Sequence, residues 1–211
     1  MVAASAVRET VIYQRVETAA KAIGLMVMGA LHPKAHYDAD DCGTLVLLGT
    51  GPAYWPILTA APEYHDAAPD PVDRFSQRTI TALATSLGPD VSVVFPFGGP
   101  PYAPFIDWAL KSGRAFTSPT GMLVHDTVGM MTSYRGALWF PDEFPFPVPA
   151  GVHPCEACAG QPCTTACPVE ALGADAPYNV AACHEYLDTG AGGVCMGAGC
   201  AARLACPLSD G

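Results

Sequence analysis

Eight of the nine cysteines in this 211-residue chain fall in its last third, in two sets of four. The first set reads Cys155-x2-Cys158-x4-Cys163-x3-Cys167-Pro168, and the second reads Cys183-x11-Cys195-x4-Cys200-x5-Cys206-Pro207. Thiolates are soft ligands that suit iron in a tetrahedral sulfur field. Quartets that end in Cys-Pro are typical of chains that hold two 4Fe–4S clusters, in which the cysteine before proline binds the cluster of the other set. The pattern therefore predicts two 4Fe–4S clusters and redox chemistry.

This crossed ligation assigns every cysteine of the two sets to one cluster. The first cluster takes Cys155, Cys158, Cys163 and Cys206, and the second takes Cys167, Cys183, Cys195 and Cys200. Three gaps are two residues longer than in the short bacterial pattern, and the x11 gap is much longer. Two zinc ions with four cysteines each are the main alternative, and disulfides are a third. Cys42 lies far from both sets and is expected to be an ordinary thiol.

Charge and composition exclude some partners. The formal net charge is −10, whereas a nucleic-acid-binding protein needs basic patches to neutralise phosphate. From residue 151 onward Arg203 is the single Lys or Arg, set against six acids: Glu156, Glu170, Asp175, Glu185, Asp188 and Asp210. Such a surface suits a basic redox partner protein, and it equally suits plain solubility. No apolar run reaches the length of a membrane span, and the N-terminus lacks a signal-peptide pattern. We therefore expect a cytoplasmic protein, in which clustered cysteines bind metal more often than they form disulfides.

Hydrophobic periodicity predicts alternating helices and strands before the cysteines. Helices are expected over residues 6–23, from Asp70-Pro71 to Gly88 with the Asp70 carboxylate as the N-terminal cap, and from Pro104 to Gly113. Strands are expected over 25–31, 44–50, 91–95, 122–125 and 131–140. Residues 141–154 contain five prolines, which makes this stretch extended and stiff. The predicted organisation is an α/β body over 1–140, a proline-rich linker over 141–154 and an iron–sulfur module over 155–211.

The start of the second cysteine set resembles known electron-transfer modules. Cys183-His184-Glu185-Tyr186-Leu187 is similar to the ferredoxin module of epoxyqueuosine reductases and of corrinoid reductive dehalogenases. In both families that module passes electrons to cobalamin held by a nitroreductase-like α/β domain. The resemblance implies a ferredoxin-like C-terminal module and a nitroreductase-like body.

The body carries a related resemblance, to proteins that remove the upper ligand of vitamin B12. It rests on Asp70-Pro71-Val72-Asp73 at a helix start and on His125-Asp126-Thr127-Val128-Gly129 followed by Arg135-Gly136. Ala103–Gly113 also resembles a helix of epoxyqueuosine reductases. The resemblance implies a cobalamin-processing type of domain with Arg135, His125 and Gly129 as cofactor-binding residues. From the residues themselves, Arg135 could equally pair with an acid such as Asp126, and His125 could be a hydrogen-bonded core histidine.

One departure from the epoxyqueuosine reductases concerns their catalytic aspartate. The matching position is Pro101, which cannot donate a proton. The chain is also shorter than those enzymes and does not show their helical repeats. Reduction of epoxyqueuosine is therefore not expected.

Three functions follow from these patterns. The first is an iron–sulfur redox protein, and as an enzyme a reductase, that passes electrons from two 4Fe–4S clusters to a corrinoid or flavin in the body. The second is a cobalamin-binding or trafficking module with structural clusters. The third is an interaction protein without its own cofactor pocket. The expected partners are a redox protein, a corrinoid or flavin ligand and a second copy of the chain in a homodimer, with neither nucleic acid nor membrane.

Overall fold

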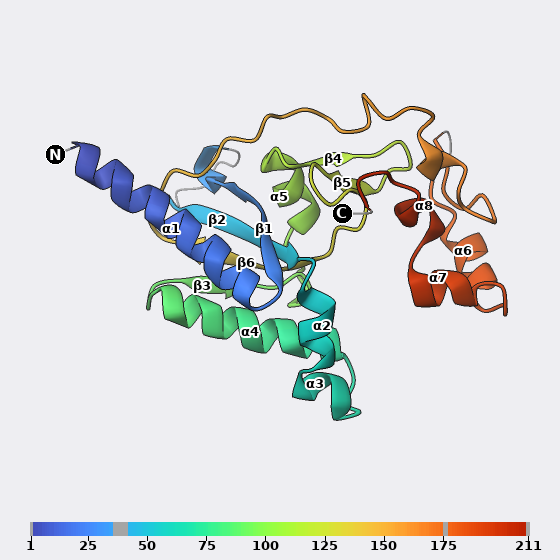
Figure 1. The fold of residues 1–211 in the computed structure, drawn as a ribbon, viewed down its shortest axis with the longest axis horizontal. Helices are drawn as coiled ribbons and strands as arrows, with labels where there is room; N and C mark the ends of the chain where they lie inside the picture. The colour runs from blue at the N-terminus through green and yellow to red at the C-terminus, as the bar shows by residue number, and fades with distance from the viewer. Residues whose placement is uncertain (1, 36–41, 175–176, 210–211) are drawn as a thin grey trace. The chain divides into compact units, whose positions relative to one another are not determined.

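The computed structural model describes residues 2–35, 42–174 and 177–209, and the chain divides into two compact units. Unit 1 comprises Met1–Gly113 and Ser133–Pro149, and unit 2 comprises Arg114–Thr132 and Ala150–Gly211. Figure 1 shows the elements of both. Unit 1 contains α1 (Val2–Ala22), β1 (Leu25–Leu31), η1 (Pro33–Ala35), β2 (Thr44–Thr50), α2 (Tyr54–Thr59), α3 (Pro62–His65), α4 (Pro71–Leu87), β3 (Ser92–Val94), α5 (Phe105–Lys111) and β6 (Tyr134–Phe140). Unit 2 contains β4 (Ala115–Thr117), β5 (Leu123–His125), η2 (Pro162–Thr164), α6 (Val180–Leu187), α7 (Gly193–Ala198) and α8 (Ala201–Leu204).

Unit 1 is built on a four-stranded sheet in the order β1-β2-β6-β3, in which every pairing is antiparallel. Strand β2 lies between β1 and β6, with Val46 opposite Ala30 on one side and Leu138 on the other. Its residues are buried except for the last, as a continuous apolar run predicts for a strand covered on both faces. The fold is thus a mixed α/β fold with an antiparallel sheet.

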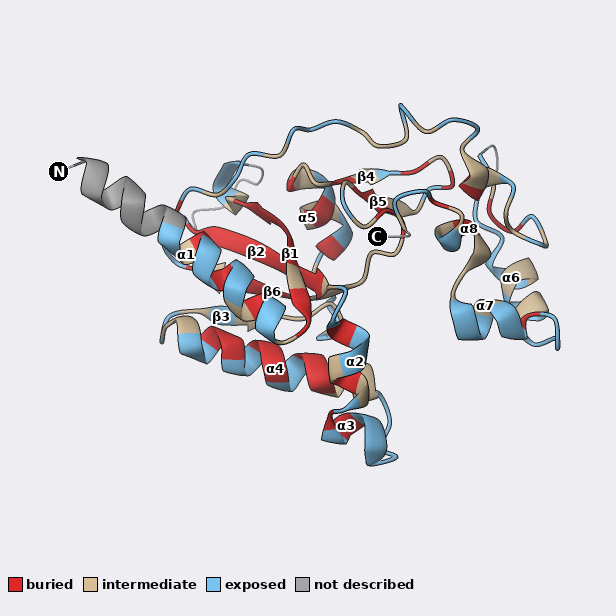
Figure 2. Cartoon of the chain, viewed as in Figure 1, coloured by how far each residue is buried: buried red, intermediate tan, exposed pale blue. Residues whose placement is uncertain are grey.

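Helices α1 and α4 cover one face of this sheet (Figures 1 and 2). Val16 and Ala20 of α1 and Ile80 of α4 are fully buried and belong to the same core as β-strand residues such as Leu138. Helix α5 contacts β1. Burying each large aliphatic side chain contributes about 1.5–3 kcal/mol, so the packing of α1 and α4 on the sheet is a main source of the stability of unit 1.

The N-terminus of α4 differs from the sequence prediction. Asp70 does precede the helix, but it adopts a left-handed conformation (φ 55°) and its side chain caps nothing. Its backbone carbonyl instead accepts hydrogen bonds from the amides of Asp73 (3.1 Å) and Arg74 (3.0 Å). The short helices α2 and α3 were not predicted, because four to six residues are too few to show a helical repeat.

Unit 2 contains little regular structure. Its two strands, β4 and β5, form a small antiparallel hairpin, and the cysteines lie on turns and on the short helices η2, α6 and α7. Helices α6 and α7 have no buried residues (Figure 2). A segment with so few buried apolar side chains gains little from hydrophobic burial, so other interactions must order it.

The proline-rich stretch is divided between the two units. Phe144 is buried in the core of unit 1, its amide donates to Thr44 Oγ1 (3.1 Å), and Phe146 packs against the same core. Residues from Ala150 onward belong to unit 2. The two phenylalanines explain why the first part of this stretch packs on the sheet.

No helix in the described part of the chain combines the length and the apolar character needed to cross a membrane.

Candidate functional site

The cysteines assigned to the first cluster gather in unit 2. Cys163, on η2, and Cys206, directly after α8, are both buried and share a small hydrophobic core with Val124 and Met130. Cys155 is partly buried and packs against this core. Cys206 thus lies with Cys155 and Cys163 of the first cysteine set, although more than 40 positions separate it from either of them in sequence.

The thiols of Cys155 and Cys163 are both influenced by the thiols of Cys158 and Cys206. Burial raises the pKa of the Cys155 thiol, and the neighbouring thiols of Cys163, Cys206 and Cys158 raise it further because nearby thiolates repel. Burial likewise raises the pKa of Cys163, with Cys206 and Cys158 adding to it. The repulsion between the thiolates disappears when protons or a metal cation bind to the sulfurs. Iron is one of the cations that thiolates bind. We call Cys155, Cys158, Cys163 and Cys206 the first thiol group.

Gly129 holds the segment that carries Cys206. Its backbone lies in the left-handed region (φ +58°), and a Cβ atom there would stand 2.9 Å from Cys206 Sγ and 2.8 Å from the backbone of Leu208 and Ser209. The amide of Met130 donates to Ser209 Oγ (3.2 Å). The turn after β5 therefore packs tightly on the C-terminal segment, and only glycine fits at position 129 without displacement.

His153 fixes the start of the first thiol group. The amide of Cys155 donates to His153 Nδ1 (3.2 Å), so that nitrogen carries no proton and Nε2 donates to the carbonyl of Thr117 (3.1 Å). The imidazole also lies against Phe116, with ring centroids 4.8 Å apart. The side chain joins the Cys155 turn to β4. Sequence reasoning missed this residue, although its position two residues before the first cysteine was a usable signal.

The cysteines assigned to the second cluster lie on separate short elements. Cys183 is on α6 and Cys195 on α7, two helices in contact, while Cys200 precedes α8 and Cys167 follows η2. The amide of Ala171 donates to Cys167 Sγ (3.2 Å). We call Cys167, Cys183, Cys195 and Cys200 the second thiol group.

Tyr178 lies beside three members of the second thiol group. Its hydroxyl is hydrogen-bonded to Cys183, and this bond, burial and the negative charges of Cys183, Cys200 and Cys167 raise the pKa of Tyr178 to about 12. The phenol therefore stays protonated and donates to sulfur. Sequence reasoning missed Tyr178, because nothing in its spacing relates it to the cysteines.

All nine cysteines are free thiols. Among the described residues, no three His, Cys, Asp or Glu side chains stand close enough to surround one metal ion. A 4Fe–4S cluster makes a different demand, because each thiolate binds its own iron at a corner of a cube and the sulfurs stand further apart than around a single ion. Both thiol groups match a cluster in residue type and number, and in the first group the neighbouring thiols raise the pKa of Cys155 and Cys163.

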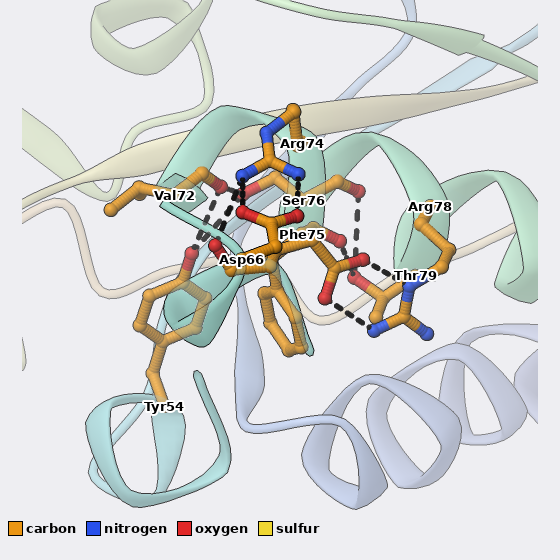
Figure 3. Close-up of polar contacts among 9 residues, drawn as sticks. Tyr54, Asp66, Val72, Arg74, Phe75, Ser76, Arg78 and Thr79 are labelled. Carbon is orange, nitrogen blue, oxygen red and sulfur yellow. Dashed lines mark hydrogen bonds and ion pairs between the residues drawn. The ribbon is translucent and has the colours of Figure 1, made fainter. Parts of the chain in front are cut away.

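Arg135, a predicted cofactor-binding residue, lies in unit 1 and is engaged with α4. Its guanidinium forms an ion pair with Asp73, and its Nε donates to Ser76 Oγ (3.1 Å). Ser76 in turn accepts from the Tyr54 hydroxyl (3.1 Å) and donates to the Val72 carbonyl (2.7 Å), as Figure 3 shows. The side chain of Arg135 is 13% exposed.

The expected alternative partner of Arg135, Asp126, binds a different arginine. Asp126 lies in unit 2, where Arg114 Nε and a terminal guanidinium nitrogen donate to its carboxylate at 3.0 and 2.8 Å. Burial would raise the pKa of Asp126, but the hydrogen bonds from Arg114 and Thr127 outweigh burial and lower it. The acid that pairs with Arg135 is therefore Asp73, which is 62 residues away in sequence.

We expect the substitution Arg135→Met to lower the free energy of unfolding by about 1–3 kcal/mol, because Asp73 and Ser76 lose a charged hydrogen-bond donor. Chemical denaturation of the purified variant measures this change. Arg15→Met, at an exposed arginine of α1, is the control and should have little effect. An Arg135→Met protein as stable as the wild type would contradict a structural role and favour the cofactor-binding prediction.

The other two predicted cofactor-binding residues, His125 and Gly129, lie in unit 2 and bracket one tight turn. Their backbones exchange hydrogen bonds of 2.8 and 3.1 Å. The His125 side chain is fully buried, and its Nδ1 accepts from the Thr127 amide (3.2 Å). These contacts stabilise the turn between His125 and Gly129 in unit 2. Cofactor binding by either residue stays a prediction.

Comparison with solved structures finds a weak likeness to other chains. No family model and no curated protein matches this sequence. One solved structure with a related chain path is the B12-trafficking protein CblC of C. elegans, described as a homologue of human MMACHC. The similarity has a TM-score of 0.46 and 13% sequence identity, and it covers 66% of this chain and 75% of that one. A likeness of this strength carries no argument about fold or function.

Proposed function

We propose that this chain is an iron–sulfur redox protein in which the two thiol groups hold two 4Fe–4S clusters. The observation that carries the proposal is the position of Cys206, which lies with Cys155, Cys158 and Cys163 rather than with its own sequence set. This is the crossed arrangement of two-cluster iron–sulfur proteins. When bound, such clusters take up and release single electrons.

The residues of unit 2 have defined roles in this proposal. The first thiol group binds one cluster in a water-poor setting, since Cys163 and Cys206 are buried. The second thiol group binds the other cluster, where the Ala171 amide and the Tyr178 hydroxyl donate to ligand sulfurs. Hydrogen bonds to sulfur stabilise its negative charge and so help to set the reduction potential.

The proposal also includes an electron acceptor bound in the body, residues 1–140. The sequence resemblance suggests a corrinoid or flavin in residues 1–140, so that the protein acts as a reductase or with a redox partner. Its support is the order of short motifs along the sequence. A cobalamin-binding module with structural clusters is the alternative that the same motifs allow.

Metal analysis of protein purified without oxygen tests the clusters. We expect about eight iron atoms and eight sulfides per chain, as two 4Fe–4S clusters require, with broad visible absorption that bleaches on reduction. The same sample is assayed for zinc, cobalt and flavin. Stoichiometric zinc without visible absorption after reconstitution would refute the iron–sulfur proposal.

Cobalamin and flavin mononucleotide, added separately to the reduced protein, test the acceptor. A spectral shift followed by reduction supports the reductase. A spectral shift without reduction supports the cobalamin-binding module. If neither compound causes a spectral shift, the body binds no acceptor, and the proposal that the protein holds two clusters is unaffected.

A further inference from the structure

Unit 2 is assembled from two separate stretches of chain, residues 114–132 and 150–211, and Arg203 connects them. Arg203 is the single Lys or Arg from residue 151 onward, and it is half-buried. Its Nε donates to the carbonyl of Met130 and a terminal guanidinium nitrogen donates to the carbonyl of Thr132, both at 2.6 Å. The guanidinium therefore binds the first stretch, while the backbone of the same residue belongs to the second.

The two hydrogen bonds suit an arginine better than any other side chain. They are stronger than bonds between neutral groups, because the donor carries a charge. The guanidinium presents five N–H groups in a rigid planar fork, so one side chain serves two carbonyls at once. A lysine keeps the charge on a flexible stem, and a glutamine amide is neutral. Position 203 thus carries a side chain able to hold two points of a neighbouring backbone.

The backbone of Arg203 belongs to the same turn as Cys206. The Cys206 amide donates to the Arg203 carbonyl (3.3 Å), and the Ser209 amide donates to the Cys206 carbonyl (2.8 Å). Helix α8, on which Arg203 lies, also contacts η2, which carries Cys163, and Ala202 of α8 is fully buried. Fixing the Arg203 side chain therefore fixes the turn that carries the Cys206 thiol.

The segment that Arg203 binds is also the one against which Cys206 packs. Met130 is buried in the small core that contains Cys163 and Cys206. At the preceding residue, Gly129, a Cβ atom would stand 2.9 Å from Cys206 Sγ. The Cys206 thiol thus lies where its own turn meets the Met130 segment, and the hydrogen bonds of Arg203 hold the turn and the segment together.

We propose that Arg203 is a positioning residue for Cys206: its hydrogen bonds to the carbonyls of Met130 and Thr132 keep the Cys206 thiol beside Cys163 in the first thiol group. A cysteine that joins the other sequence set cannot be placed by the spacing within its own set, so a tertiary contact must place it. The effect of Arg203 on a cluster rests on the proposed function, whereas its effect on the position of the thiol does not.

Alkylation of the individual thiols in the intact, metal-free chain, measured by mass spectrometry, tests the position of Cys206. In Arg203→Gln, Cys206 should react about tenfold faster than in the wild type, because its turn opens more readily once the two charged hydrogen bonds are lost. Cys167, whose Sγ accepts a hydrogen bond from the Ala171 amide, should keep its rate. General destabilisation of the chain would instead raise both rates together.

Two further variants complete this experiment. Arg203→Lys keeps a charged donor but not the planar fork, so it should raise the Cys206 rate selectively and by less than Arg203→Gln. It decides the question if Arg203→Gln does not fold. Glu185→Gln, at an exposed residue of the same unit, is the control and should leave the Cys206 rate unchanged.

Protein reconstituted with iron and sulfide tests the effect on the proposed cluster of the first thiol group. In the presence of an iron chelator, the spin-resonance signal of this cluster should decay about tenfold faster in Arg203→Gln than in the wild type. The signal of the other cluster should keep its rate. Cys206→Ala identifies the two signals, because it removes a ligand of the first thiol group alone.

The outcomes for Arg203 and for the clusters are distinguishable. A wild type that binds no iron refutes the proposed function, and the alkylation rates then decide the role of Arg203. An unchanged Cys206 rate in Arg203→Gln overturns that role, and so does an equal rise at Cys206 and Cys167. A wild-type Cys206 that reacts as fast as the exposed Cys42 also overturns it, because the thiol would not be held. Equal decay of both resonance signals overturns the effect on the cluster.

Discussion

Replacing Cys206 with alanine is expected to remove the proposed cluster of Cys155, Cys158 and Cys163 and to leave the other proposed cluster in place. The physical reason is that Cys206 is buried next to Cys163 and influences the pKa of both Cys155 and Cys163. Iron should fall to about half of the wild-type content, since one of two 4Fe–4S clusters is lost. Spin resonance of the reduced protein identifies which signal disappears.

The reciprocal substitution Cys167→Ala should remove the cluster bound with Cys183, Cys195 and Cys200. Cys42→Ser is the matched control, because Cys42 is an exposed thiol whose contact in the structure is a hydrogen bond from Lys34 Nζ (3.3 Å). It should keep the full iron content. If Cys206→Ala removed the signal of the second thiol group instead, each sequence set would bind its own cluster and the crossed assignment would be wrong.

Gly129→Ala is expected both to destabilise unit 2 and to weaken the binding of the proposed cluster at the first thiol group. The new Cβ would meet the backbone of Leu208 and Ser209 at 2.8 Å and Cys206 Sγ at 2.9 Å, so the segment that carries this ligand must shift. Overpacking of this kind costs about 1–3 kcal/mol, and a left-handed backbone adds about 1 kcal/mol for alanine. Chemical denaturation and iron analysis of the same preparation measure both effects.

Gly121→Ala separates backbone strain from crowding. Gly121 also lies in unit 2 with a positive φ (+80°), but a Cβ there would have no atom within 4 Å. This control should lose about 1 kcal/mol of stability and keep its full iron content. Equal iron contents in the two variants would show that Gly129 does not position Cys206.

Local sequence determined several elements of unit 1. Strands β1 and β2 have the predicted bounds because each is a largely apolar run that begins directly after a glycine, Gly24 and Gly43 respectively. Helix α4 extends from Pro71 to Leu87 as predicted, since proline fits the first helical position and Gly88-Pro89 stops the helix. Each of these features depends on a few neighbouring residues, so it can be recognised in the sequence without the tertiary structure.

Cysteine spacing and type predict two thiol groups with Cys206 exchanged between the sets. The structure buries Cys206 in one small core with Cys163, and ligation of a cluster by either group stays a prediction. The supporting residues could not be found this way. His153 and Tyr178 contact Cys155 and Cys183 through single hydrogen bonds, and no periodic pattern marks such contacts.

The tertiary structure alone decided the partner of Arg135 and the sheet order β1-β2-β6-β3. It also placed His125 and Gly129 in a different compact unit from Arg135, although these residues lie within ten positions of one another. Pairings of this kind join residues tens of positions apart, and many alternatives satisfy the same local propensities. Packing of the whole chain selects among them, because only one arrangement buries the apolar faces and pairs the buried charges at the same time.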